Sequence, residues 1–391
     1  MGAEELIVER VGVFAYKGQH CSLRLTPGTR KQPVMTEQSD NRPDPGRKHR
    51  RRKRYPGSHP RRFEQRYKEL AGDDDMVRHV RRRRRTPAGS HVPVLMKEVI
   101  DALAPRPGQI VADCTLGYGG HATALARAVS PGGRVIGLDV DPLELERTRK
   151  RMEALDLPIT FHHSNFAGIA KVMAAEGLDG YDVIFADLGV SSMQIDDPAR
   201  GMSYKHDDAP LDMRMNPQRQ QTAADLLMSI SREELSRALW ELSDEPDHET
   251  IAQWIVGQRQ AAPITTTGQL KRLIFAVKGT VEKVWKKQSS YSDSHPAMRT
   301  FQALRILVND EMSAIGRLLD LAPQCLRPGG RIGVISFHSG EDRLVKRAFR
   351  DGCRQGVYAE CNRRVIRPGS REEHRNPRSS SAKFRWARLG G

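Results

Sequence analysis

The stretch Asp113-Cys-Thr-Leu-Gly-Tyr-Gly-Gly-His121, followed by Gly137-Leu-Asp-Val-Asp141, decides the fold of this chain. A short apolar run over 110–112 enters the glycine-rich turn, a helix-like segment follows over 122–129, and a second apolar run ends in Asp139. Glycines in such a turn let the backbone approach a ligand, and an acid at the tip of the second strand can bind both ribose hydroxyls. The layout predicts a nucleotide-type site at the start of a doubly wound sheet.

The turn differs from the two common phosphate-binding motifs. It is not a full GxGxxG, because His121 takes the helix-entry position, and no Gly-Lys-Ser/Thr follows. An adenosine ligand without a pyrophosphate, such as S-adenosylmethionine, fits better, with Asp139 on the ribose and the loop on the methionine portion. A tight turn without a ligand is the alternative. Asp141, before Pro142, is predicted to cap the next helix.

Strands alternate with helices after residue 90, which predicts an α/β fold with a parallel sheet. The expected strands are 110–114, 133–138, 158–162, 181–187 and 331–337, and the expected helices are 120–129, 142–154, 166–176 and 340–350. An earlier segment, Pro93–Leu103, has helical spacing. The end of the chain, Ser381–Arg388, predicts a strand that pairs antiparallel at the sheet edge, because a parallel strand needs a longer crossover.

Between the fourth and fifth expected strands the alternation stops. Residues 205 to about 290 predict the helices 221–229, 231–242, 246–260 and 267–278, and Ser231-Arg-Glu-Glu234 has the form of a capping box. One long helix, 296–323, should then return the chain to the sheet, since proline is tolerated at the first helical position. We therefore predict an α/β domain over 89–204 and 296–391 and an all-helical insertion over 205–295.

The net charge of +16 is unevenly placed. Residues 1–88 carry +12, residues 343–391 carry +10, and the remainder carries −6. Basic ends suit a polyanion, most often nucleic acid, although a solvated charge run is the plainer interpretation. The basic extension 1–88 is rich in Pro and Gly with little periodicity, so we expect disorder there. It is either a lineage-specific arm or partly an over-extended reading frame.

Other features limit the class of protein. No run of about 18 apolar residues is present, so no membrane span is expected, and the absence of a signal-peptide layout makes the cytoplasm the expected location. The cysteines lack zinc spacing and predict free thiols, with a metal or pairing role for Cys353 and Cys361 as a minor alternative. The histidines form no i, i+4 pair, so no metal site is predicted.

Further polar residues follow two other strands. Ligands of open α/β sheets bind beyond the carboxyl ends of the strands, so Asp187 should face the same crevice as Asp113 and Asp139. A loop-capping role is its alternative. His338 is either a proton carrier or a loop histidine held by the backbone. The stretch Arg200–Arg214 interleaves both charges with apolar residues, which favours an ordered functional loop.

Seven motifs occur in order over about 90–390. They are Gly117-Tyr-Gly-Gly-His121, Leu138-Asp-Val-Asp-Pro142, Asp187-Leu-Gly-Val-Ser-Ser-Met-Gln194, Asp208-Ala-Pro-Leu-Asp-Met-Arg214, His295-Pro-Ala-Met-Arg-Thr-Phe-Gln-Ala-Leu-Arg305, Ser336-Phe-His-Ser339 and Asn376-Pro-Arg-Ser-Ser-Ser-Ala-Lys383. Together they resemble the bacterial methyltransferases that modify the N4 atom of a cytidine in 16S ribosomal RNA, the RsmH or MraW family. The resemblance does not cover 1–88. Gly340 stands where the family usually has Leu, and Met202 and Tyr204 stand where it has Phe.

The resemblance implies a class I S-adenosylmethionine-dependent methyltransferase fold, Rossmann-like, with six parallel strands and one antiparallel strand. It makes 89–204 and 296–391 the methyltransferase domain and 205–295 a substrate-recognition insertion. The implied methyl donor is S-adenosylmethionine. The family's cofactor contacts fall here on Gly119, Gly120, His121, Asp139, Phe166, Asp187 and Gln194.

The implied reaction is displacement at the S-methyl carbon by the exocyclic amine of a cytidine in the decoding region of the small ribosomal subunit. Asp187 is the candidate acceptor for that amine, and Tyr204 is the suggested stacking partner. The predicted RNA contacts are Arg200, Tyr204, Arg214, Arg299, Arg305, His338, Arg378 and Lys383. The alternatives are a non-catalytic, cofactor-binding assembly factor and a methyltransferase of DNA or protein. A homodimer stays open.

Overall fold

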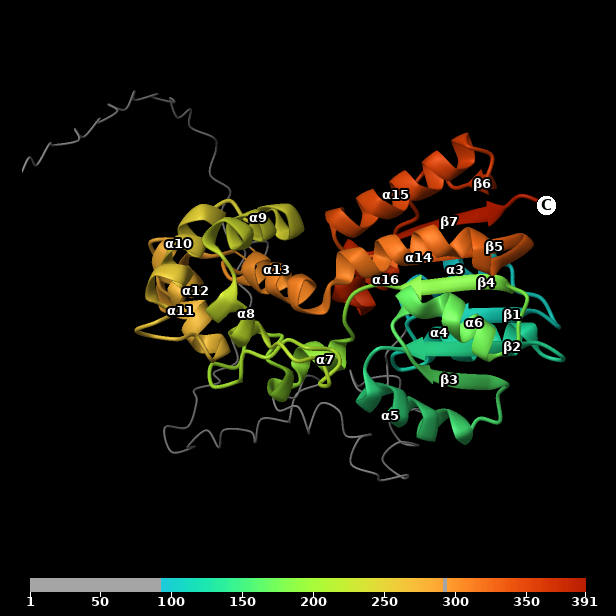
Figure 1. Cartoon of the computed structure of the whole chain (residues 1–391), viewed down its shortest axis with the longest axis horizontal. Helices are drawn as coiled ribbons and strands as arrows, with labels where there is room; N and C mark the ends of the chain where they lie inside the picture. The colour runs from blue at the N-terminus through green and yellow to red at the C-terminus, as the bar shows by residue number, and fades with distance from the viewer. Residues whose placement is uncertain (1–92, 291–293) are drawn as a thin grey trace, which may run out of the picture. The chain divides into compact units, whose positions relative to one another are not determined.

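The computed structural model describes residues 93–290 and 294–391 (Figure 1). The disorder expected over 1–88 lies outside the described residues. The described part contains one twisted sheet covered by helices and a separate cluster of helices with its own core.

The sheet has seven strands in the order β3-β2-β1-β4-β5-β7-β6. Their bounds are β1 Ile110–Asp113, β2 Arg134–Asp139, β3 Ile159–His163, β4 Tyr181–Asp187, β5 Leu326–Ser336, β6 Tyr358–Cys361 and β7 Lys383–Leu389. Neighbours pair parallel except that β7 runs antiparallel to both β5 and β6. The chain order reverses between β1 and β4, which makes their carboxyl ends the switch point where such sheets bind ligands. The predicted class I methyltransferase fold is confirmed.

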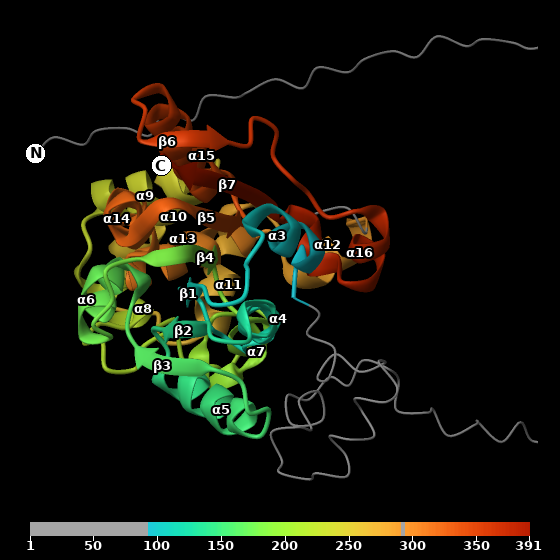
Figure 2. The same cartoon turned by 90° about the vertical axis from the view of Figure 1, so that its right-hand side faces the viewer.

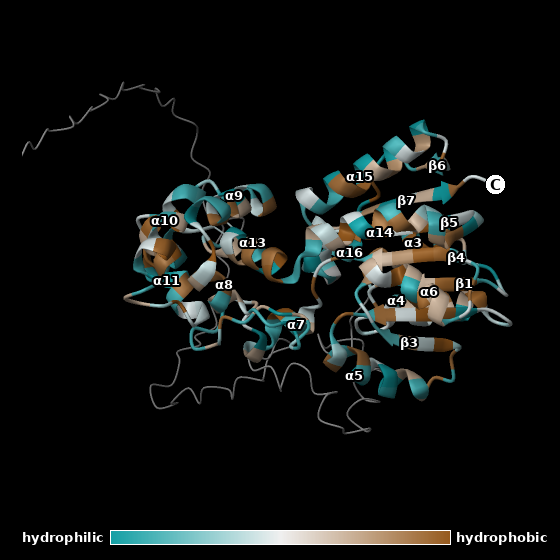
Figure 3. Cartoon of the chain, in the orientation of Figure 1, coloured by the Kyte–Doolittle hydropathy of each residue, from teal (hydrophilic) through white to brown (hydrophobic). Residues whose placement is uncertain are grey.

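Helices cover both faces of the sheet, as the view along it shows (Figure 2). One face packs against α3 (Met96–Leu103), α4 (Gly120–Val129) and α5 (Pro142–Glu153), and the other packs against α6 (Ile169–Ala175), α14 (Glu311–Cys325) and α15 (Ser339–Arg354). The central strands are therefore apolar along most of their length, as the colouring of β1 and β4 in Figure 3 shows.

The second core belongs to the helical cluster, which we define as α8 to α13. These helices are α8 Ala223–Ser229, α9 Arg232–Ser243, α10 His248–Gln258, α11 Thr267–Val277, α12 Glu282–Gln288 and α13 Met298–Asn309. Capping boxes begin three of them, at Thr222, Ser231 and Thr266. The box at Ser231 was predicted and is confirmed. Each box satisfies backbone N–H groups that the first helical turn leaves unpaired.

The single helix predicted over 296–323 is wrong. Asp310 adopts a left-handed conformation with φ 52°, which ends α13 at Asn309 and lets α14 begin at Glu311. A left-handed residue cannot continue the i to i−4 hydrogen bonds of a right-handed helix. Phe301 and Leu304 of α13 pack in the core of the helical cluster, although the predicted division assigned them to the α/β domain. The domain division itself stays a prediction.

Smaller differences concern the ends and edges of elements. The helix predicted over 166–176 begins as the 3-10 turn Phe166–Gly168, and β5 starts at Leu326, earlier than predicted. The sequence pattern did not indicate β6, α7 (Ser192–Asp196) or α16 (Ser370–Arg375), since each is too short to show a period. Among the described residues, no helix combines the length and apolar character that a membrane crossing requires.

Candidate active site

Three aspartates end three neighbouring strands of the sheet. Asp113 is the last residue of β1, Asp139 of β2 and Asp187 of β4. Because these strands are parallel and adjacent, the three carboxyl groups lie along one edge at the switch point. The structure thus brings together residues that lie up to 74 positions apart in the sequence.

The glycine-rich turn between β1 and α4 depends on its glycines. Gly117 and Gly119 have φ angles of 45° and 75°, in the left-handed region. A Cβ on Gly119 would lie 2.6 Å from the sulfur of Met152, and one on Gly120 would lie 2.4 Å from Cγ of Pro93. Side chains at these two positions would therefore force the turn away from α5 and from the segment before α3.

Asp139 ties this turn to β2. Its Oδ2 accepts a hydrogen bond from the Gly117 N–H at 2.7 Å, and its Oδ1 accepts one from the Asp141 N–H at 2.9 Å. Burial raises the pKa of Asp139 to about 6, although these two hydrogen bonds act in the opposite direction. Each carboxylate oxygen can accept a further bond, which is what a ribose diol needs. The carboxyl group and the turn therefore fit the predicted adenosine ligand.

His121 is neutral and its tautomer is fixed. Nε2 lies 3.0 Å from the Val94 carbonyl oxygen, which only accepts, so Nε2 carries the ring proton and Nδ1 is an acceptor. Burial lowers the pKa of His121 to about 4. Nδ1 lies 3.7 Å from Oδ2 of Asp187. The imidazole thus presents a lone pair to this carboxyl group.

Asp187 has the most perturbed carboxyl group of the three. Burial, and then the negative charges of Asp113 and Glu341, raise the pKa of Asp187 to about 8. The side chain is 26% exposed, yet its Oδ1 is buried without a hydrogen-bond partner among the described residues. Its backbone N–H donates to Oγ1 of Thr115 at 2.6 Å, which holds the end of β4 against the turn after β1.

Buried polar atoms without partners gather at this edge. Eight side-chain atoms without a hydrogen bond occur in the described part of the chain, and four of them belong to Asp113, Asp187, His338 and Glu341. Nε2 of His338 and Oε1 of Glu341 face each other at 3.2 Å, which leaves the oxygens of Asp113 and Asp187 as the two without a nearby polar partner. These residues end or follow β1, β4 and β5, which are neighbours in the sheet. A buried polar atom without a partner costs about 1–3 kcal/mol, so a concentration of them indicates a place where a ligand or substrate completes the bonding.

Gln194 and Asp141 stabilise the loop after β4. Nε2 of Gln194 donates to Oδ2 of Asp141 at 2.9 Å, and Oε1 accepts from the Ser191 N–H in the capping box of α7. Oδ1 of Asp141 accepts from the N–H groups of Leu143 and Glu144, which confirms its predicted role as the cap of α5. The cofactor contact predicted for Gln194 stays a prediction.

Phe166 opens the 3-10 turn after β3 and is half-buried against the core on the α6 and α14 face. It follows the strand next to β2, which carries Asp139. The predicted packing of Phe166 on adenine stays a prediction.

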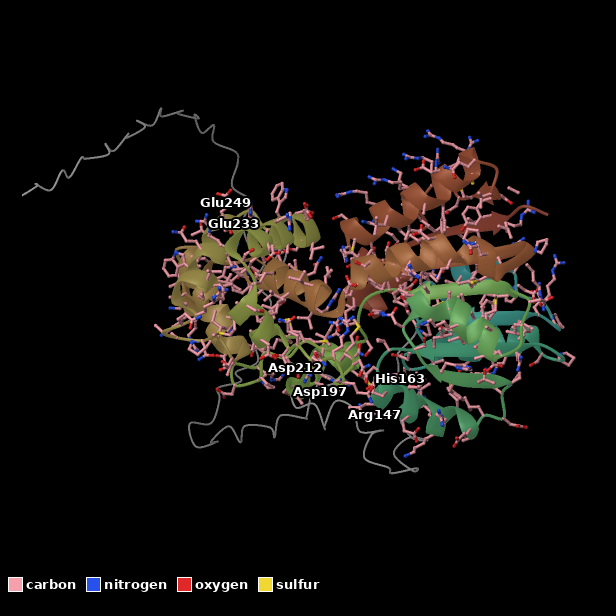
Figure 4. All side chains as sticks on the ribbon, viewed as in Figure 1. Arg147, His163, Asp197, Asp212, Glu233 and Glu249 are labelled. Atoms are coloured by element: carbon pink, nitrogen blue, oxygen red, sulfur yellow. The ribbon has the colours of Figure 1, made fainter. Side chains whose placement is uncertain are left out.

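The structure divides the predicted RNA contacts by burial. Arg200 is 8% exposed and donates to Oδ2 of Asp141 at 2.6 Å, and the partly buried Arg305 forms two hydrogen bonds with Glu311, at 2.8 and 2.9 Å. Both guanidinium groups therefore serve internal ion pairs. Arg214 pairs with Asp212, which is labelled in Figure 4.

The other predicted RNA contacts also have defined surroundings. Arg299 is exposed and donates to the Asp244 carbonyl, and Arg378 is 38% exposed and pairs with Asp196. Lys383 begins β7. Tyr204 stacks on His295 with 3.9 Å between ring centroids, so one face of its ring is occupied in this structure.

His338 is held by the backbone, as one of its two interpretations expected. Its Nδ1 accepts the Glu341 N–H at 3.4 Å, which makes it the cap of α15. A Cβ on Gly340 would lie 3.1 Å from this nitrogen, so the glycine gives the ring its room. Sequence reasoning missed Glu341, whose signal was the capping-box spacing of His338-Ser-Gly-Glu341.

A separate cavity of about 420 Å³ lies at the opposite edge of the sheet. Its lining includes Gln109, Asp182, Arg331 and Arg388, at the amino ends of β1, β4 and β5 and the end of β7. No residue predicted to bind the cofactor lines it. The chemistry of the aspartates, rather than the size of a cavity, therefore identifies the candidate site.

A model of the MraW methylase family matches residues 88–389. The chain belongs to this family. It is 42% identical over 360 residues to the ribosomal RNA small subunit methyltransferase H 1 of Lachnoclostridium phytofermentans, covering 90% of this chain and 96% of the relative. It is also 42% identical to the protein of the same name from Agathobacter rectalis, covering 87% of this chain and 98% of that one.

The solved structure of a SAM-dependent methyltransferase from Aquifex aeolicus aligns with 81% of this chain and 98% of its own, at 10% identity and a TM-score of 0.34. That similarity adds nothing to the fold shown by the strand order. The family match, together with the turn and Asp139, confirms S-adenosylmethionine as the cofactor.

The alignments also bear on the basic extension. Residues 89–391 are only 303 of the 391 residues, so an alignment covering 90% of the chain must include part of 1–88. The resemblance therefore extends further than the sequence motifs indicated.

Proposed function

We propose that this protein transfers a methyl group from S-adenosylmethionine to the exocyclic N4 of a cytidine in the 16S RNA of the small ribosomal subunit, in the decoding region. The names of the relatives support the ribosomal substrate. The observation that carries the chemistry is Asp187, whose buried Oδ1 lacks a partner among the described residues and whose pKa is raised to about 8.

The chemistry of the amine explains why such a carboxyl group is useful. When bound, the cofactor supplies an electrophilic methyl group on a sulfonium. The N4 lone pair of cytosine is delocalised into the ring, so the amine needs orientation and an acceptor that binds more tightly as the nitrogen becomes positive. The ionised Asp187 carboxylate accepts an N–H bond in the ground state and then takes the proton. Its raised pKa makes it a stronger base than an ordinary aspartate.

His121 has a supporting role in this scheme. Its Nδ1 is a permanent acceptor 3.7 Å from Oδ2 of Asp187, because Nε2 is held by Val94. Once Asp187 has taken a proton, Nδ1 can accept a hydrogen bond from the protonated carboxyl group. The imidazole does not take the proton itself, since burial lowers its pKa to about 4.

The substrate must reach this edge as an unpaired base, because its Watson–Crick edge has to enter the site. Of the predicted set, the exposed Arg299 and the partly exposed Arg378 would bind the RNA backbone. Arg200 and Arg305 would act indirectly, by holding the loop and helix junctions to which they are ion-paired. RNA binding should then weaken steeply with salt.

One experiment tests the proposal directly. Nucleosides from 16S RNA of cells with and without the gene are compared by mass spectrometry, and the purified protein is incubated with small subunits and labelled cofactor. The expected result is loss of one N4-methylated cytidine without the gene and its formation in vitro. Label in DNA or protein instead of RNA, or cofactor binding without transfer, would overturn it in favour of the other candidate activities.

A further inference from the structure

Glu341 is a buried carboxylate for which the proposed reaction has no direct use. It is the third residue of α15 and has 0% exposure. Its Oε2 accepts hydrogen bonds from the N–H groups of Phe337 at 2.7 Å and His338 at 3.2 Å. Its Oε1 lies 3.2 Å from Nε2 of His338 without an aligned hydrogen bond. Glu341 therefore fixes the turn that follows β5.

This turn runs beside the end of β4. Asp187 pairs with Ile335 of β5, and the Leu188 N–H donates to the Ile335 carbonyl at 2.9 Å. A Cβ on Gly189, in the loop after Asp187, would lie 3.8 Å from the ring of Phe337. The segment that Glu341 anchors is thus directly attached to the segment that carries Asp187.

Glu341 acts on Asp187 through its charge rather than through a hydrogen bond. Its negative charge is one of the causes that raise the pKa of Asp187. The other groups facing Asp187 are Asp113 at the end of β1, whose pKa burial raises to about 7, and the neutral His121 of α4. Glu341 is therefore the charge contributed by α15.

Glu341 is kept ionised in spite of its burial. Burial raises its pKa, but His338, the Phe337 N–H and the cation of Arg305 together hold the pKa of Glu341 below its ordinary value. Arg305 is oriented by two hydrogen bonds to Glu311 at the start of α14. The negative charge of the buried Glu341 is thus maintained by Arg305 of α13 and by His338 at the cap of α15. Glu311 of α14 contributes by orienting Arg305.

We propose that Glu341 is a positioning residue for methyl transfer: its buried carboxylate fixes the turn after β5 against the segment that carries Asp187 and supplies a buried negative charge at this edge of the sheet. This inference rests on the proposed role of Asp187. It separates two carboxylates with different tasks, since Asp187 exchanges a proton and Glu341 stays charged throughout.

The variant Glu341→Gln separates charge from structure, because glutamine keeps an oxygen for the two N–H groups and loses the charge. Removing a negative charge lowers the pKa of Asp187, so the ionised, active form persists to lower pH. The acid limb of the rate against pH should move to lower pH. We divide the rate of each protein at a given pH by the plateau rate of the same protein. At a pH below the wild-type midpoint, this fraction should be several-fold larger for Glu341→Gln than for the wild type.

The measurement is the pH dependence of kcat/KM for methyl transfer to small ribosomal subunits, which reports ionisations of the free enzyme. The matched control is Asp342→Asn, because Asp342 is the adjacent carboxylate, pairs with Arg385, and is not among the charges that raise the pKa of Asp187. The acid limb of kcat/KM against pH for Asp342→Asn should keep the wild-type midpoint. Thermal unfolding of each variant monitors the fold.

A second variant, Glu341→Asp, keeps the charge on a shorter side chain and should keep the wild-type midpoint even if its plateau rate falls. An unmoved limb in Glu341→Gln, or an equal movement in Glu341→Asp, overturns the inference. If the Gln protein does not fold, movement of the acid limb to lower pH in Glu341→Asp overturns the inference, because that variant keeps the charge. An Asp187→Asn protein with wild-type activity would instead refute the proposed function, which keeps the two failures distinct.

Discussion

The aspartates that end the sheet strands and the acidic residues of the helical cluster have pKa values shifted in opposite directions. In the helical cluster, hydrogen bonds from Lys271 and Lys286 lower the pKa of Glu282 to about 2. At the sheet edge, burial and neighbouring carboxylates raise the pKa of Asp187 to about 8 and that of Asp113 to about 7. Satisfied acids stabilise a fold, whereas acids with raised pKa values cost stability and are suited to proton transfer.

The same contrast holds for hydrogen bonds. In the helical cluster, polar groups are paired in capping boxes and ion pairs. Lys278, for example, contacts Glu245 and Asp247 at 2.5 and 2.6 Å. At the sheet edge, buried oxygens of Asp113 and Asp187 lack partners among the described residues. The difference indicates that polar contacts stabilise the helical cluster, whereas the sheet edge keeps acceptors available for a ligand.

The strongest test of this contrast is Asp187→Asn. The rate of methyl transfer to small subunits should fall at least about 100-fold, because general-base contributions are typically 10²–10⁴. The amide keeps the shape of the carboxyl group, so thermal stability should not fall. Single-turnover kinetics with labelled cofactor measure the effect, and a loss of less than tenfold would contradict the assigned role.

The next largest effect is expected for Asp139→Ala. Loss of bonds between a charged acceptor and the ribose should weaken cofactor binding by about 10–100-fold, at ~1.5–3 kcal/mol per charged bond. Calorimetric titration with the demethylated cofactor measures it. Asp179→Ala, an exposed carboxylate paired with Arg327, is the control and should bind normally. Equal affinities for the Asp139 variant and the wild type would exclude Asp139 from the site.

A smaller effect on stability is expected for Lys271→Met in the helical cluster. The buried Lys271 bridges Asp207 and Glu282 at 2.6 and 2.8 Å, and both acids are partly exposed. The loss should be about 1–2 kcal/mol, less than for a fully buried pair. Chemical unfolding measures it, and the pH midpoint of methyl transfer should not change. A moved midpoint would show that the two regions are not independent.

The smallest effects are the opposite pH dependences of two neutralising substitutions. Glu282 has a lowered pKa, so it stabilises the folded protein above its ordinary pKa and loses this effect as the pH falls towards 2. Asp187 has a raised pKa, so its contribution is present at low pH and is lost as the pH rises towards 8.

Glu282→Gln should therefore be less stable than the wild type at neutral pH, by up to about 1 kcal/mol, and equal to it in strong acid. Asp187→Asn should gain stability relative to the wild type as the pH rises. Urea unfolding at several pH values decides both. If the stabilities of the two variants relative to the wild type changed with pH in the same direction, the contrast between the regions would be contradicted.

Local signals in the sequence determined the parts of the protein that depend on near neighbours. The glycine turn at Gly117–Gly120, the aspartates that end strands, the cap at Asp141 and the box at Ser231 were all predicted, since each depends on a few adjacent residues. The parallel sheet followed from alternation, and the motifs indicated the family before any geometry was known.

Only the tertiary structure decided which charged side chains are free to act. Arg200 meets Asp141 across 59 positions, and the break at Asp310 separates a helix of the helical cluster from a helix of the sheet. The charge of Glu341, 154 positions away, is one of the causes that raise the pKa of Asp187. Pairing, burial and pKa depend on distances between residues remote in the chain, and no local pattern encodes those distances. The sequence alone predicted a nucleotide-type site at the turn and Asp187 as the candidate acceptor; the fold determined how strongly burial and neighbouring charges shift the pKa of that carboxyl group.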